Sequence, residues 1–171
     1  MKTKTFGLTL MFCFLTAAVC FGADPQIGTW KLNEAKSQFA PGTGKNTMVV
    51  YTDAAGGKVK ITTDGIDAHG KTTHSEWTGK FDGRDYPVTG DPASDMRSYT
   101  KLDERTMDFT VKKHGKITVT GRVAVAADGK SRTVTTSGRT APPAGRAWQR
   151  GDFQAEQKGK KYQNTAVFEK Q

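Results

Sequence analysis

Cysteine is scarce in this sequence of 171 residues, which contains only Cys13 and Cys20. Both lie within residues 1–22, which have the layout of a secretory signal peptide: two lysines, an uncharged apolar run and then small residues. The run is too short for a comfortable membrane span. Cleavage after Gly22 would remove both cysteines. We therefore expect a secreted or periplasmic mature domain, 23–171, that is stable without disulfides and has no transmembrane segment.

An alternative is a lipoprotein acylated at Cys20, but Val19 is larger than the small residue that this processing normally requires before the cysteine. Loss of the signal peptide leaves 149 residues, enough for one domain with its own core. The net charge falls from +9 to +7, because Lys2 and Lys4 leave without any acid. Export removes most opportunity to meet nucleic acid. The positive charge therefore predicts attraction to an anionic envelope surface, or simply a soluble exterior.

Histidine is almost as rare, at His69, His74 and His114, and the spacing never places two metal ligands with a third nearby. The mature sequence also lacks a cysteine nucleophile, a Gly-x-Ser-x-Gly elbow, a phosphate-binding loop and a dinucleotide-binding glycine motif. These gaps predict a protein that is not an enzyme and that has no catalytic residue, metal or cofactor.

Helical periodicity is missing as well, because no window repeats apolar residues at i, i+3, i+4 and i+7 over three turns. Short β-rich runs recur instead every 8–12 residues or so, separated by turns with Gly and Asp, which is typical of consecutive antiparallel hairpins. Closure removes the open edges of such a sheet. The prediction is an all-β fold, a single up-and-down antiparallel β-barrel of about 8–10 strands. Strands are expected at 27–32, 46–52, 57–63, 72–80, 85–89, 96–101, 106–113, 116–126, 130–136 and 164–169.

Four predicted turns test this reading, because paired residues of adjacent strands must share one face of the sheet. Two are two-residue turns with Gly second, and two are three-residue loops with Gly last. All four bring apolar residues together. The hairpin after 96–101 accepts either two or three turn residues, so Tyr99 or Ser98 could face inward. The pairs are Val123 with Val134 (turn 128–129), Trp77 with Val88 (82–83), Val49 with Ile61 and Tyr51 with Val59 (54–56), and Val111 with Ile117 and Phe109 with Val119 (113–115).

The resulting inner face is mostly apolar with scattered hydroxyl groups, which suits either a pocket for an amphipathic molecule or a solid barrel core. Arg132 shares this face, because it pairs with Val125 in the hairpin. Its guanidinium could bind a ligand carboxylate through two parallel hydrogen bonds. Alternatively, three residues past a turn, it would lie near the rim and reach water. The candidate ligand-binding residues are Tyr51, Trp77, Tyr86, Phe109 and Arg132.

Gly28-Thr29-Trp30 resembles the Gly-x-Trp of the lipocalins and the wider calycin group, and "AVFEK" at 166–170 is similar to the last strand of intracellular fatty-acid-binding proteins. The resemblance implies that Trp30 plugs the closed end of a barrel that holds a small hydrophobic or amphipathic ligand. The sequence departs from both groups. Lipocalins set an arginine from near the last strand against the Trp, where this chain offers only Lys170. The two-helix lid and the final-strand Arg-x-Tyr clamp of fatty-acid-binding proteins are missing, and 33–39 allows one helical turn at most.

A basic stretch at about 138–163 shows no strand alternation and contains Pro142-Pro143. A loop of this length in a compact barrel is either functional or without a role. Arg146, Trp148 and Arg150 are candidates for contact with an anionic surface, because cationic and aromatic side chains act together there. The alternative function is thus a non-catalytic envelope protein that binds an anionic polymer, a lipid surface or a protein partner through this loop.

Overall fold

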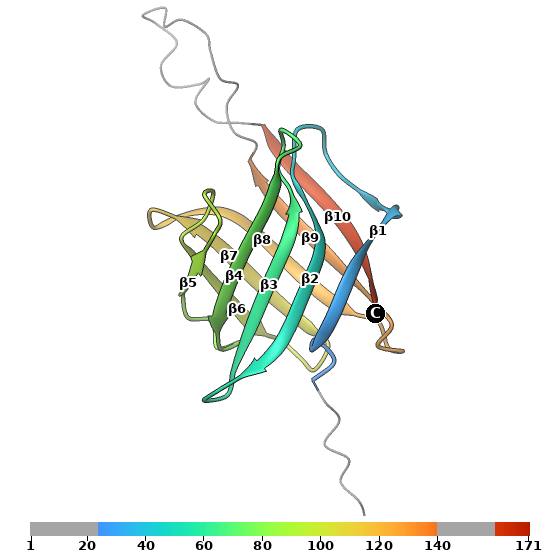
Figure 1. Cartoon of the computed structure of the whole chain (residues 1–171), viewed down its shortest axis with the longest axis vertical. Helices are drawn as coiled ribbons and strands as arrows, with labels where there is room; N and C mark the ends of the chain where they lie inside the picture. The colour runs from blue at the N-terminus through green and yellow to red at the C-terminus, as the bar shows by residue number, and fades with distance from the viewer. Residues whose placement is uncertain (1–23, 140–159) are drawn as a thin grey trace, which may run out of the picture.

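Ten strands form one closed barrel in the computed structural model, which describes residues 24–139 and 160–171 (Figure 1). The order around the barrel is β1-β10-β9-β8-β7-β6-β5-β4-β3-β2, and every neighbouring pair is antiparallel. This confirms the predicted single up-and-down barrel and is consistent with a lipocalin-like or calycin-like fold. The strands are β1 (Gly28–Gln38), β2 (Lys45–Ala54), β3 (Lys58–Ile66), β4 (Thr72–Gly79), β5 (Tyr86–Thr89), β6 (Met96–Lys101), β7 (Thr106–Lys113), β8 (Lys116–Val125), β9 (Ser131–Arg139) and β10 (Lys161–Lys170).

The predicted signal peptide and positions 140–159 of the basic stretch lie outside the described residues. Strands β9 and β10 extend further than expected on either side of that stretch, so that Arg139 pairs with Lys161. No helix in the described part of the chain is long and apolar enough to cross a membrane.

Two of the predicted hairpin registers are confirmed. Val123 lies opposite Val134, and Trp77 lies opposite Val88. Both registers hold although the connecting loops, 80–85 and 126–130, are longer than the predicted two-residue turns. Each loop keeps a Gly at positive φ, 78° at Gly83 and 67° at Gly129. The open question about β6 is also settled, because the side chain of Tyr99 joins the core cluster.

The other two predicted registers are wrong. In the β2–β3 hairpin Tyr51 pairs with Ile61, not Val59, because the loop is 55–57 and has two successive glycines with positive φ. A shift by two residues keeps the same face inward. In the β7–β8 hairpin the turn is only His114-Gly115, and a bulge follows in the ladder after Val111. Ile117 therefore leaves the predicted inner face and is 62% exposed.

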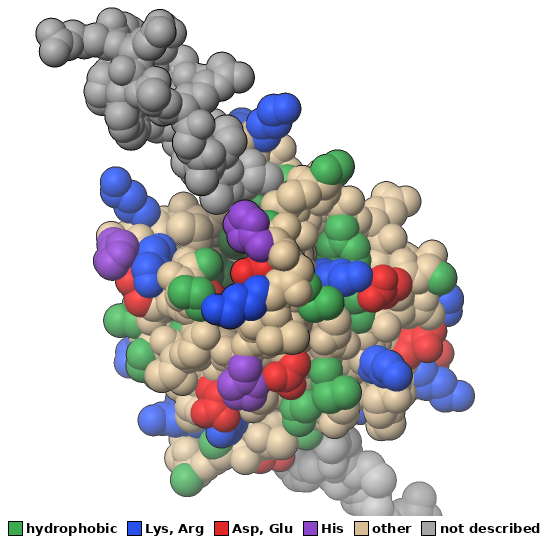
Figure 2. All heavy atoms as spheres, turned by 45° about the horizontal axis from the view of Figure 1, so that its top comes forward, with side chains coloured by type: hydrophobic (Ala, Val, Ile, Leu, Met, Phe, Trp, Pro, Cys, Tyr) green, Lys and Arg blue, Asp and Glu red, His purple; other side chains and the backbone are tan. Residues whose placement is uncertain are grey.

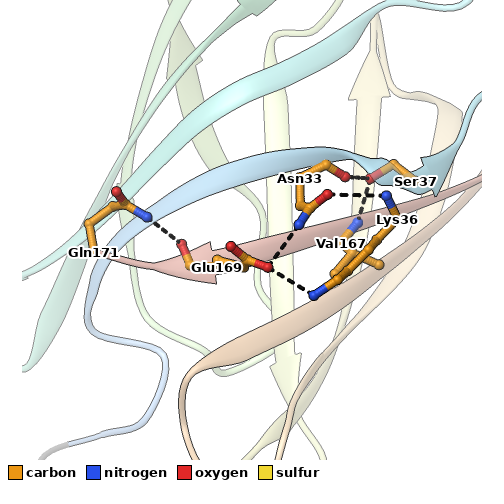
Figure 3. A network of polar contacts seen from close by, with 6 residues as sticks. All are labelled: Asn33, Lys36, Ser37, Val167, Glu169 and Gln171. Carbon is orange, nitrogen blue, oxygen red and sulfur yellow. Dashed lines mark hydrogen bonds and ion pairs between the residues drawn. The ribbon is translucent and has the colours of Figure 1, made fainter.

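The second half of β1 is irregular, since the register against β10 slips between Asn33 and Gln38. Here the chain makes turn-like contacts instead of the single helical turn that seemed possible. The amide of Lys36 donates to the Asn33 side chain, and the Ser37 hydroxyl donates to the Asn33 carbonyl oxygen (Figure 3). Ser37 Oγ in turn accepts the backbone N–H of Val167, while Glu169 accepts hydrogen bonds from Asn33 and Lys36. These contacts fix the bulged segment to β10.

Because the strands alternate in direction, the loops separate into two ends of the barrel. One end carries the chain before β1 and the loops at 55–57, 80–85, 102–105 and 126–130, and the other carries 39–44, 67–71, 90–95, 114–115 and the β9–β10 connection. We call the first of these the closed end and the second the open end.

Candidate ligand-binding cavity

The barrel encloses a cavity of about 480 Å³. This volume falls within the range of roughly 300–1,000 Å³ that is typical of small-molecule sites. The sequence left open whether the barrel holds a pocket or has a solid core, and the structure shows a pocket. Its wall is largely apolar and includes Val49, Tyr99, Phe109, Val123, Val134 and Phe168.

Trp30 lies behind Arg132 at one end of this cavity, and its side chain is fully buried. Its indole N–H donates to the backbone carbonyl oxygen of Gln26 at 2.9 Å, and the Gln26 side chain donates to the carbonyl oxygen of Arg105 at 3.0 Å. The segment before β1 is thus tied across the barrel to the β6–β7 loop. Lys170 Nζ lies 5.2 Å from the centroid of the Trp30 ring. It thus takes the position against the Trp that an arginine has in lipocalins.

Arg132 is buried, with 2% of its surface exposed, so the expectation that it reaches water at the rim is wrong. It does lie three residues past the 128–129 turn, but this is the end that the Trp30 plug covers. Its guanidinium carbon lies 4.7 Å from the ring centroid of Trp30, 4.6 Å from that of Tyr51 and 5.2 Å from that of Phe168. Its Nε and Nη1 have no hydrogen-bond partner among the described residues.

Burial shifts the pKa values of Arg132 and Tyr51 in opposite directions. It lowers the pKa of Arg132, while the Tyr51 hydroxyl beside it acts against that shift. Burial also raises the pKa of Tyr51 far above its usual value, although Arg132 opposes the rise. Arginine remains charged in proteins, so the closed end of the cavity presents a cation and a protonated hydroxyl.

A second guanidinium, that of Arg97 on β6, lines the cavity and was missed from the sequence. Its Nη2 lies 3.8 Å from the Asp91 carboxylate, and its Nε lacks a partner within the described part of the chain. Burial alone would lower the pKa of Arg97, but the neighbouring Tyr99 and Asp91 outweigh it and the pKa is raised. Strand alternation was the available signal, because Arg97 and Tyr99 are two residues apart and share a face.

Three of the five candidate residues line the cavity: Tyr51, Phe109 and Arg132. The other two, Trp77 and Tyr86, belong to an aromatic cluster in the wall, with ring centroids 5.7 Å apart. The Trp77 indole donates to the carbonyl oxygen of Arg97 at 2.9 Å, so it supports the strand that carries this arginine. Arg146, Trp148 and Arg150 lie outside the described residues.

The open end is partly covered by the β1–β2 loop, from which Phe39 contributes to the cavity wall. This loop is anchored by Asn164, a buried residue of β10. The Asn164 side-chain oxygen accepts the backbone N–H of Ala40 at 2.8 Å, and its amide donates to the hydroxyl of Thr43 at 3.2 Å. Lys45 and Arg139 line the cavity as well, so cationic groups lie along the way in.

On the outer surface, basic and acidic side chains are interspersed over the face seen in Figure 2, with no single large basic patch. Several surface charges form ion pairs, as in Arg122 with Asp108, where both nitrogen–oxygen distances are below 3 Å. The described residues contain no group of three or more His, Cys, Asp and Glu that could hold a metal ion. His74 is exposed, and its Nδ1 lies 2.7 Å from the carboxylate of Asp64.

A scan of protein-family models gave no match to this sequence, and a search of curated proteins gave none either.

Proposed function

We propose that this protein is an exported, non-catalytic binding protein that holds a small hydrophobic or amphipathic molecule inside its barrel. The observation that carries the proposal is the cavity of about 480 Å³, mostly apolar and with Trp30 behind Arg132 at one end. Desolvation of the ligand in this cavity would supply the affinity, at roughly 25 cal/mol for each Å² of apolar surface buried. Export rests on the signal-like residues 1–22, and the resemblance of Gly28-Thr29-Trp30 to lipocalins supports the same function.

A neutral fluorescent probe, N-phenyl-1-naphthylamine, tests this proposal. We expect its fluorescence to rise on binding to the wild-type protein. The substitution Val134→Trp places an indole in the cavity and should weaken binding at least tenfold. Val50→Trp is the matched control, because Val50 lies on β2 beside inward-facing Val49 and so points outward. Absence of probe binding, or equal weakening by both variants, would contradict a ligand site inside the barrel.

A second candidate function is supported by a groove on the outer side of β8, β9 and β10. The described residues that line it include Lys116, Arg139 and Lys161 and no acidic side chain. Such a groove suits an anionic surface, and the basic stretch at 138–163 begins and ends beside it. Retention on vesicles that contain anionic lipid, lost in moderate salt and in the double variant K116E/K161E, would support this function. Retention that both changes leave intact would contradict it.

A further inference from the structure

We infer that the ligand is an oxyanion-bearing amphiphile, a carboxylate above all, which lies in the cavity with its acidic group against Arg132 at the closed end. This inference rests on the proposed binding function and specifies the chemical class of its ligand. It also gives the ligand a direction, with the acid deep in the barrel and the apolar part toward the open end.

The first argument is the unmet hydrogen bonding of Arg132. Apart from a side-chain hydrogen bond to the Tyr51 hydroxyl, its contacts with Trp30, Tyr51 and Phe168 are with aromatic rings, which attract a cation but do not replace in-plane oxygen acceptors. Nε and Nη1 are left without partners among the described residues. A buried donor without an acceptor is costly, so native proteins almost always satisfy it. Arg132 lines the cavity, and a carboxylate oxygen placed there can accept a charge-assisted hydrogen bond from its guanidinium.

The second argument is charge. Among the described residues, the side chains that act electrostatically on Arg132 are Tyr51 and Tyr99, neither of which is an acid. Arg97, the other guanidinium described above, has the Asp91 carboxylate at 3.8 Å. Arg132, Arg97 and Asp91 together give this part of the wall a net positive charge. A buried charge needs an opposite charge nearby, and the described part of the chain places no carboxylate against Arg132.

The third argument is the order of groups along the cavity. Arg132 and Tyr51 lie next to Trp30 at the closed end. Apolar side chains, including Val123 and Phe109, continue the wall toward the open end. A protonated Tyr51 hydroxyl can donate a further hydrogen bond to an oxyanion. The cavity therefore complements a molecule whose acidic head lies against Arg132 and whose apolar tail follows the wall.

Isothermal titration calorimetry with two matched probes, decanoate and 1-decanol at neutral pH, tests the inference. We expect the wild-type protein to bind decanoate at least tenfold more tightly than decanol. In Arg132→Met this preference should disappear through weaker decanoate binding, with decanol affinity kept. Tyr51→Phe removes only a hydroxyl and should reduce the preference without abolishing it. Decyl sulfate in place of decanoate shows whether carboxylate in particular, or any oxyanion, is selected.

The outcomes separate the two proposals. If neither decanoate nor decanol binds, the binding function itself is wrong and this inference falls with it. If both bind with equal affinity, or if Arg132→Met weakens both equally, the cavity binds ligands but the assignment of Arg132 is overturned. Arg132→Lys serves as a folding control, since it keeps the positive charge and loses the planar fork; partial retention of the preference is expected.

Discussion

Replacing Arg132 by methionine should not destabilise the ligand-free protein, although the residue is 2% exposed. Its two N–H groups without partners cost about 1–3 kcal/mol each, or about 2–6 kcal/mol together. The three aromatic rings return about 0.5–2 kcal/mol each, a sum of the same size. Methionine keeps an unbranched apolar chain in the same place. We therefore expect the free energy of unfolding to stay within about 1 kcal/mol of the wild-type value, or to rise.

Urea denaturation of the ligand-free protein measures this, with Ile61→Ala as the contrasting variant. Ile61 is as deeply buried, at 1% exposed, and has no unmet polar group. Its truncation should cost about 2–5 kcal/mol. A loss of more than about 2 kcal/mol in Arg132→Met would refute the reasoning, because the guanidinium would then be a stabilising part of the core. Saturating decanoate should stabilise the wild type, by about 2.7 kcal/mol at a hundred times its Kd, and the Arg132→Met variant much less.

Three further predictions concern the frame around the cavity. Asn164→Ala leaves the Ala40 N–H without its acceptor and should cost about 1–3 kcal/mol in urea unfolding; an unchanged midpoint would contradict the anchoring role. Gly121→Ala should cost about 1–3 kcal/mol, because a Cβ there would lie 2.5 Å from the Thr135 carbonyl oxygen; a wild-type Tm would contradict this crowding. Backbone N–H groups of Lys71 and His69 lower the pKa of Asp67 below 3.8. Its stabilisation is therefore complete above that pH and lost as the pH falls through the lower folded value, so acid should lower Tm less in Asp67→Asn than in the wild type.

Local patterns were sufficient for most of the fold. Turn residues with Gly fixed where strands end, and alternation of apolar residues fixed which face turns inward. The ladder Val123 opposite Val134 follows from these two facts alone. The two wrong registers arise where the same residues allow two different turn lengths. Gly56 and Gly57 can each occupy the left-handed position, and His114 adopts a positive φ that sequence would assign to glycine.

The candidate site was harder to predict, because its key property depends on what lies beyond the strand. Pairing within one hairpin placed Arg132 on the inner face correctly, opposite Val125. Whether that position meets water depends on Gln26 and Trp30, which reach it from the far end of the sequence. Burial of this kind is a long-range consequence of barrel closure, and a short stretch of sequence cannot predict it. The same holds for Arg97, whose neighbour Asp91 comes from a loop at the open end.

The two cations that contact the Trp30 ring show how one plug can serve both structure and binding. Lys170 is exposed, and its Nζ lies 3.4 Å from the carbonyl oxygen of Pro25, so water and backbone satisfy it. Arg132 lies on the cavity side, and its Nε and Nη1 have no hydrogen-bond partner among the described residues. A lysine outside is enough to hold the indole in place, because a cation over an aromatic face is attractive even when exposed. The stability of the plug therefore does not require a second cation inside. The cost of burying Arg132 is explained once an acidic ligand shares the cavity with it.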